Sequence, residues 1–185
     1  MLLVEIGNAE RRIVEGVAAK LAEKWGEYEK IRAGLLAEYA AIRCLNQLGA
    51  TPELRFNEQY NESGGDGGFD FAFPDEAMRW DVKSCSYHQG GFYGEFIRKT
   101  KASAIIGVLR TKEPLHYQVL GFIPVSHLQR VTFIPADSTY FKCLMELKKV
   151  FPGSFGEPRS IPIQTGLEST ASILTGITKV VDRIQ

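Results

Sequence analysis

The residues best suited to chemistry lie in two neighbouring stretches near the middle of the chain. Residues 64–73 read GGDGGFDFAF, and residues 78–84 read MRWDVKS. Apolar and polar residues alternate in both, with the period of a β-strand. The alternation places Asp70 on the face opposite the aromatic residues of the first strand, and Asp81 and Lys83 together on one face of the second. Two carboxylates can bind a hard divalent cation. An ammonium group beside them can orient a water molecule or exchange a proton with it.

A turn between the two strands determines which residues oppose each other. Residues 74–77, with the sequence PDEA, favour a tight turn that pairs Phe73 with Met78. In that register Asp70 lies directly opposite Asp81, with their Cβ atoms ~5 Å apart. Two like charges in these positions require a proton or a cation between them. Mg²⁺ fits such an oxygen-only site because it prefers oxygen ligands.

A third carboxylate, Glu38, lies in the middle of an apolar helix stripe. The stripe has alternating spacings of four and three residues, and its members are Ile31, Leu35, Glu38, Ile42 and Leu45. A charge in a buried stripe needs a partner, because unpaired burial is costly. If this helix packs on the sheet, we expect Glu38 to meet the pair of aspartates. Gly34, one turn earlier, would allow a close approach of helix and sheet.

Together these residues resemble the PD-(D/E)xK nuclease superfamily of restriction-endonuclease-like proteins, and among them the resolvase-like and phage-encoded members. The family pattern is a Glu on the first core helix, an Asp on the first strand of a hairpin, and Asp/Glu-x-Lys on the second strand. Glu38, Asp70 and residues 81–83 match these three parts. Phe69 stands where the name-giving Pro of the family would be. The resemblance covers about residues 30–123.

The resemblance implies a Mg²⁺-dependent endonuclease that hydrolyses DNA phosphodiester bonds, with Mn²⁺ as a substitute for Mg²⁺. The implied catalytic residues are Glu38, Asp70, Asp81 and Lys83. The implied metal ligands are Asp70, Asp81 and the Val82 carbonyl, with Glu38 bound directly or through water. Lys83 would orient or deprotonate the attacking water. Double-stranded or branched DNA is the expected partner, and a C2 homodimer is expected because two strand cuts need two sites.

Further residues near this segment are candidates for contact with a substrate. The densest positive stretch contains Arg98, Lys99 and Lys101, with Arg110 and Lys112 after the next strand. It is expected to bind backbone phosphates or else to form a solvated helix face. Asp66 is an auxiliary carboxylate or simply a turn residue of the glycine-rich loop. His88 contacts the substrate or is a solvated loop residue. Cys85 is expected to be a small buried residue rather than a nucleophile.

Composition limits the class of protein. The chain has 185 residues, 44% of them hydrophobic and 24% charged, which is typical of one ordinary globular domain. Its 22 basic residues balance its 22 acidic residues, so binding of DNA must rely on a local patch. Three scattered cysteines and three distant histidines argue against a disulfide framework and against a closed zinc site. No apolar run is long enough to span a membrane, so we expect a cytoplasmic protein. The resemblance implies a microbial or phage-infected cell.

The pattern of the remaining sequence predicts an α/β protein with a mixed central sheet of about five strands flanked by helices. We expect one domain over residues 1–185, with a restriction-endonuclease-like core implied by the resemblance. The predicted helices cover residues 9–28, with Asn8 as N-cap, and residues 29–48, before Gly49. The predicted strands are 54–60, 68–73, 78–85, 104–109 and 117–123. A short helix at 126–131 precedes a C-terminal helical extension, about 137–185, with one helix after Asp137 and a last one over 167–184.

Two alternative functions remain open from the sequence. The first is a catalytically inactive binding or structural protein with the nuclease fold, which would suit the zero net charge. The second is a small-molecule enzyme or a partner-binding protein in which the acidic pair holds a structural ion. Cleavage of DNA separates the nuclease from both alternatives, and binding of a cation without affinity for DNA favours the second.

Overall fold

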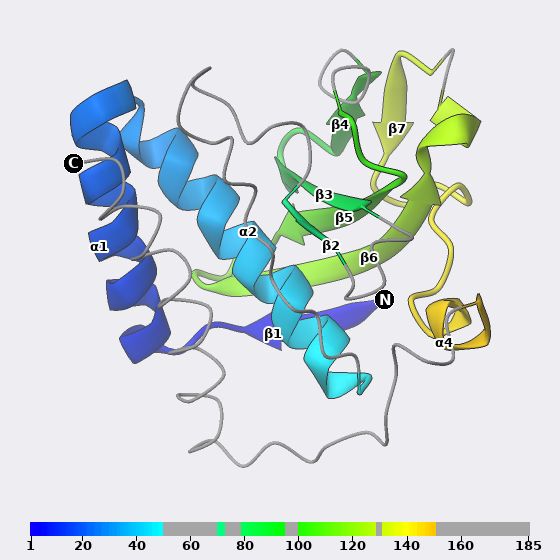
Figure 1. Cartoon of the computed structure of the whole chain (residues 1–185), viewed down its shortest axis with the longest axis horizontal. Coiled ribbons are helices and arrows are strands. Elements are labelled where there is room, and N and C mark those ends of the chain that lie inside the picture. Colours follow the sequence, from blue (N-terminus) through cyan, green and yellow to red (C-terminus); the bar gives the residue numbers. More distant parts are fainter. Residues whose placement is uncertain (50–69, 73–78, 95–99, 129–130, 151–185) are drawn as a thin grey trace.

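The computed structural model describes residues 1–49, 70–72, 79–94, 100–128 and 131–150 (Figure 1). The strands are β1 (Leu2–Glu5), β2 (Phe71–Ala72), β3 (Arg79–Ser86), β4 (Gly91–Tyr93), β5 (Ala104–Arg110), β6 (His116–Pro124) and β7 (Phe133–Pro135). The helices are α1 (Asn8–Trp25), α2 (Tyr28–Gln47), the 3₁₀ helix η2 (Val125–Leu128) and α4 (Glu146–Val150).

A mixed five-stranded sheet forms the centre of the described structure, with the order β1-β6-β5-β3-β2. The central pair, β3 and β5, is parallel, and the other neighbours are antiparallel. The prediction of an α/β protein with a mixed sheet is therefore confirmed. The membership of the sheet differs from the prediction, because the edge strand β1 was not predicted. The predicted strand 54–60 lies outside the described residues.

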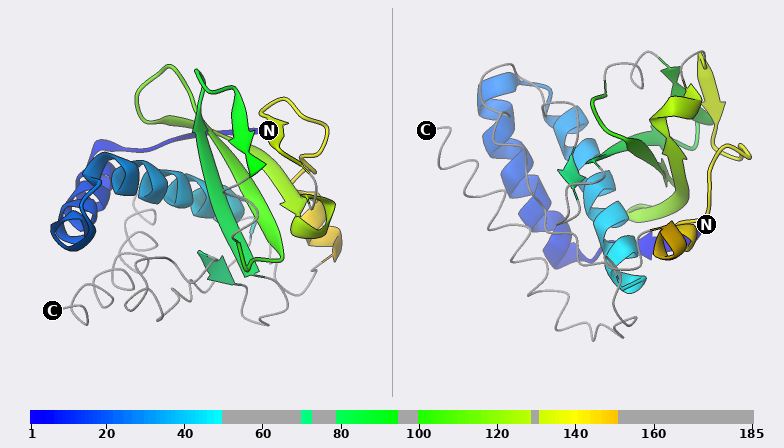
Figure 2. Two further views of the ribbon diagram at one scale, coloured as in Figure 1. Left: turned by 90° about the horizontal axis from the view of Figure 1, so that it is seen from above. Right: turned by 45° about the vertical axis from the view of Figure 1, so that its right-hand side comes forward.

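The two faces of the sheet are covered by different elements. Alternate residues of β3, Trp80 and Val82, join one buried cluster with α1 and α2. Cys85, on the opposite face, belongs to a second cluster with Phe92 of β4 and Ile134 of β7. Both views in Figure 2 show α2 beside the sheet and α1 on the outer side of α2. One face of β3 therefore packs on α1 and α2, and the other packs on β4 and β7. The position of a polar residue along β3 determines which of these layers its side chain faces.

Glycine residues lie at three of the ends of the two long helices. Gly7, rather than the predicted Asn8, is the N-cap of α1, because its N–H donates to Glu10 Oε2 at 2.6 Å. Asn8 is instead the first helical residue. Gly26 ends α1 with φ +69°, and Gly49 follows α2 with φ +89°, a backbone conformation that favours glycine. The predicted stop at Gly49 is confirmed.

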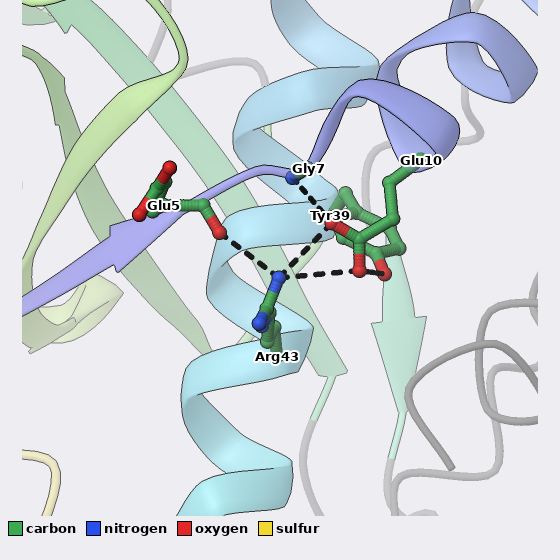
Figure 3. Close-up of polar contacts among 5 residues, drawn as sticks. All are labelled: Glu5, Gly7, Glu10, Tyr39 and Arg43. Carbon is green, nitrogen blue, oxygen red and sulfur yellow. Dashed lines mark hydrogen bonds and ion pairs between the residues drawn. The ribbon is translucent and has the colours of Figure 1, made fainter. Parts of the chain in front are cut away.

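Glu10 joins α1, α2 and β1 through one carboxylate (Figure 3). Tyr39 of α2 donates its hydroxyl to Glu10 Oε1 at 2.7 Å, and Arg43 donates to both carboxylate oxygens at 3.0–3.1 Å. Arg43 also donates to the backbone carbonyl of Glu5 at the end of β1, at 2.9 Å. Three elements that are separate in sequence are therefore held at one point.

The region after residue 124 differs most from the prediction. The predicted helix 126–131 is the 3₁₀ helix η2. The helix expected after Asp137 begins only at Glu146, because Lys142 instead forms backbone hydrogen bonds with Phe122 of β6. Strands β4 and β7, which pair as a small second sheet, were not predicted. The part of the extension beyond residue 150 lies outside the described residues, and none of the helices described is long and apolar enough to cross a membrane.

Replacing Glu10 tests the importance of this contact. Glu10→Ala leaves Tyr39 and Arg43 without their acceptor, so we expect the free energy of unfolding to fall by about 2 kcal/mol. Urea unfolding measures the change. Glu23→Ala removes an exposed glutamate from the same helix and should change stability little. Equal effects of the two substitutions would show that the contact does not stabilise the fold.

The cysteines provide a second test of the packing. Burial raises the pKa of Cys44 to about 12 and that of Cys85 to about 11, whereas Cys143 is exposed. At pH 8 only about one Cys85 in a thousand would be a thiolate. An aromatic disulfide reagent should therefore react rapidly with one thiol of the native protein and with all three after denaturation. Cys143→Ser should abolish the rapid reaction, and rapid reaction of Cys44 or Cys85 would contradict the packing described.

Candidate active site

The pairing of β2 with β3 has the register that the sequence predicts. Phe71 opposes Trp80 and Ala72 opposes Arg79. Phe71 and Trp80 stack with their ring centroids 6.4 Å apart, and both are fully buried. The predicted turn and the pairing of Phe73 with Met78 lie outside the described residues. The stacked aromatic side chains of the two strands therefore fix the register. Asp70 directly precedes β2.

Asp70 binds the edge of β3 with both its backbone and its side chain. Its N–H donates to the Trp80 carbonyl at 2.7 Å, and its Oδ2 accepts the Val82 N–H at 2.5 Å. The N–H and the carbonyl of one residue point to the same side of an extended strand. The Val82 carbonyl therefore points to the edge of β3 on which the Asp70 carboxylate lies, as expected for two ligands of one cation.

Asp81 and Lys83 form an ion pair within β3. The Lys83 Nζ lies 2.7 Å from Asp81 Oδ1, and the Asp81 side chain is 1% exposed whereas that of Lys83 is 25% exposed. Their register partners on β5 are Ile105 and Gly107. A Cβ atom on Gly107 would overlap the ring of Phe141, so this ring covers the sheet beside Lys83. The carboxylate is buried, and the ammonium group compensates its charge.

Glu38 occupies the stripe position that the sequence predicts. Leu35, Ile42 and Leu45 of the stripe are buried and Glu38 is half-buried. Its Oε1 lies 4.0 Å from the place of a Cβ atom on Gly34, one turn earlier in α2. This is an ordinary van der Waals distance, so the carboxylate does not require a glycine at position 34.

The face of the sheet separates Glu38 from the ion pair. Helix α2 packs on the face of Trp80 and Val82, whereas Asp81 and Lys83 lie on the alternate positions of β3 and face the other layer. Among the described residues no three His, Cys, Asp or Glu side chains form a group that could hold a metal ion. The structure thus brings Asp70 to Val82 and Asp81 to Lys83, but it does not join Glu38 to them in a three-carboxylate cluster.

The other candidate residues are not gathered around Asp70 and Asp81 in the part of the chain that the structure describes. Lys101 is exposed just before β5, and Arg98, Lys99 and Asp66 lie outside the described residues. His88 follows the far end of β3, where its ring packs on Tyr87 with a centroid distance of 3.7 Å. Five strand residues separate Asp81 from the end of β3, about 16 Å of extended chain. His88 is therefore placed at the opposite end of the strand from the carboxylates.

Arg79 is a residue of this region to which sequence analysis assigned no role. It is exposed at the start of β3, two positions before Asp81 and on the same face. The alternating pattern of residues 78–84 already contains it, but a single arginine in a strand carries no signal of its own.

The whole chain was compared with protein-family models, with curated proteins and with solved structures. None of the three comparisons found a match. The resemblance to the PD-(D/E)xK nucleases therefore depends on the residues themselves and on their arrangement along β2, β3 and α2.

Proposed function

We propose that the protein is a Mg²⁺-dependent endonuclease that hydrolyses phosphodiester bonds of DNA, on a restriction-endonuclease-like core. The observation that carries the proposal is the pair of contacts on β3, Asp70 with Val82 and Lys83 with Asp81. The carboxylate of Asp81 and the ammonium group of Lys83 are on β3. The carboxylate of Asp70, which directly precedes β2, bonds to the residue between them, Val82. This is the donor set that metal-assisted hydrolysis of a phosphodiester requires.

The oxygen donors suit magnesium. Asp70, Asp81 and the Val82 carbonyl offer only hard oxygen atoms, and Mg²⁺ in proteins is commonly held by one or two carboxylates together with waters and substrate phosphates. A three-carboxylate cluster is therefore not needed. An ion held there would lower the pKa of a water molecule and offset the charge that develops on the scissile phosphate.

The residues of the chain have separate tasks in this hydrolysis. Asp70 accepts the Val82 N–H, and this hydrogen bond keeps the Val82 carbonyl oriented toward the edge of β3 at which Asp70 lies. Lys83, partly exposed beside Asp81, orients the attacking water and supports the charge on the phosphate. The attacking water gives up a proton to solvent and its oxygen bonds to phosphorus as the ester P–O bond breaks, and the leaving oxygen takes a proton from a second water molecule. Glu38 acts at longer range, through water, because α2 covers the other face of β3.

A cleavage assay with single variants tests the proposal. The wild type should cleave plasmid or branched DNA with Mg²⁺ or Mn²⁺, and EDTA should stop the reaction. Asp70→Asn, Asp81→Asn and Lys83→Met should each lower the rate constant at saturating enzyme by at least roughly a hundredfold, because each removes a ligand charge or the ammonium group. Glu38→Gln should lower it by only roughly tenfold, in keeping with an indirect role.

Matched controls separate chemistry from folding. Asp137→Asn and Lys20→Met change an exposed aspartate and an exposed lysine outside the site, and both should cleave as the wild type does. The unfolding midpoint of every variant is measured in parallel. A folded wild type that cleaves no DNA substrate with either metal would overturn the proposal and favour a binding or structural role. Full activity of Asp81→Asn would show that hydrolysis occurs elsewhere.

A further inference from the structure

We propose that Arg79 and Lys101 form a two-point clamp for the phosphate backbone of DNA at the end of the sheet where Asp70 and Asp81 lie. The inference rests on the proposed nuclease function and adds to it the residues that position the substrate. Arg79 is exposed at the start of β3, and Lys101 lies three residues before β5, the strand that pairs with β3. The clamp would bind phosphates without reading the base sequence.

Arg79 lies close to both aspartates along the strands. It precedes Asp81 by two positions, so its Cα lies about 7 Å from that of Asp81 on the same face of β3. Its partner across the hairpin is Ala72, which is two positions from Asp70 on β2. Arg79 is exposed, whereas Asp81 is buried, so the arginine side chain is accessible to solvent near the buried carboxylate.

Lys101 is held near Arg79 by backbone contacts. The Ser103 N–H donates to the Arg79 carbonyl at 2.8 Å, and Ser103 Oγ lies 3.5 Å from the Arg79 nitrogen. The Ala102 N–H donates to Thr100 Oγ1 at 3.0 Å, and Ala102 itself is buried. Lys101 is therefore an exposed side chain on a fixed segment, two residues from the Arg79 contact. The parallel pairing of β3 with β5 brings both cations to the same end of the sheet.

The chemistry of the two side chains suits a polyanion. The guanidinium group of Arg79 offers paired donors that match a phosphate, and the Lys101 ammonium group adds a compact charge. The net charge of the chain is zero, so attraction to DNA must come from local groups of this kind. A phosphate held here would place the neighbouring phosphodiester beside Asp70 and Lys83.

The salt dependence of DNA binding tests the clamp. A short blunt-ended duplex is titrated with protein in Ca²⁺, which replaces Mg²⁺ with another oxygen-binding cation, from about 50 to about 200 mM salt. Each lost phosphate contact should reduce the slope of log K against log salt by roughly 0.9. We expect Arg79→Gln and Lys101→Gln each to show this loss together with weaker binding. Arg79→Lys, which keeps the charge, should retain the slope.

Lys20→Gln is the matched control, because Lys20 is an exposed lysine of α1 outside the site and should leave the slope unchanged. If Arg79→Gln and Lys101→Gln fold, cleave and bind with the slope of the wild type, the clamp is wrong and the nuclease function stands. Equal loss of slope in Lys20→Gln would also overturn it, because the effect would then be one of general charge. A wild type that neither binds nor cleaves DNA overturns the nuclease function and the clamp together.

Discussion

The ion pair between Asp81 and Lys83 is the constraint on which the rest of the site depends. A carboxylate that is 1% exposed needs a positive partner, and Lys83 supplies it at 2.7 Å on the same face of β3. Slippage of β3 by one residue would exchange these charges with Trp80 and Val82 and bury them under α2. The apolar residues that alternate with the pair thus hold it on the face turned away from the helices.

The layers around the sheet hold this register in place. Glu10 ties β1, α1 and α2 together through Tyr39 and Arg43, and α2 then covers Trp80 and Val82. On the other face Gly107 gives space to the Phe141 ring beside Lys83. Each face of β3 is therefore packed against a different element, and at the β2 edge Asp70 accepts the Val82 N–H.

The sequence predicted the parts of the structure that local pattern determines. The alternation of residues 78–84 predicted which residues of β3 share a face, and the turn expected at residues 74–77 predicted the register with β2. The apolar stripe predicted α2, in which Glu38 is half-buried. Strands β1, β4 and β7 are three or four residues long and are too short to show a period. The delayed start of α4 depends on the tertiary pairing of Lys142 with Phe122. Because both faces of β3 are buried, periodicity could not show which face α2 would cover.

We propose that one cation is bound jointly by Asp70, Asp81 and the Val82 carbonyl. Anomalous diffraction from crystals grown with Mn²⁺ in place of Mg²⁺ would locate that cation. We predict a manganese peak within roughly 2.1–2.3 Å of an oxygen of each of the three groups. Manganese bound only to other residues, with Asp81 still paired to Lys83 and Asp70 to the Val82 N–H, would contradict the claim.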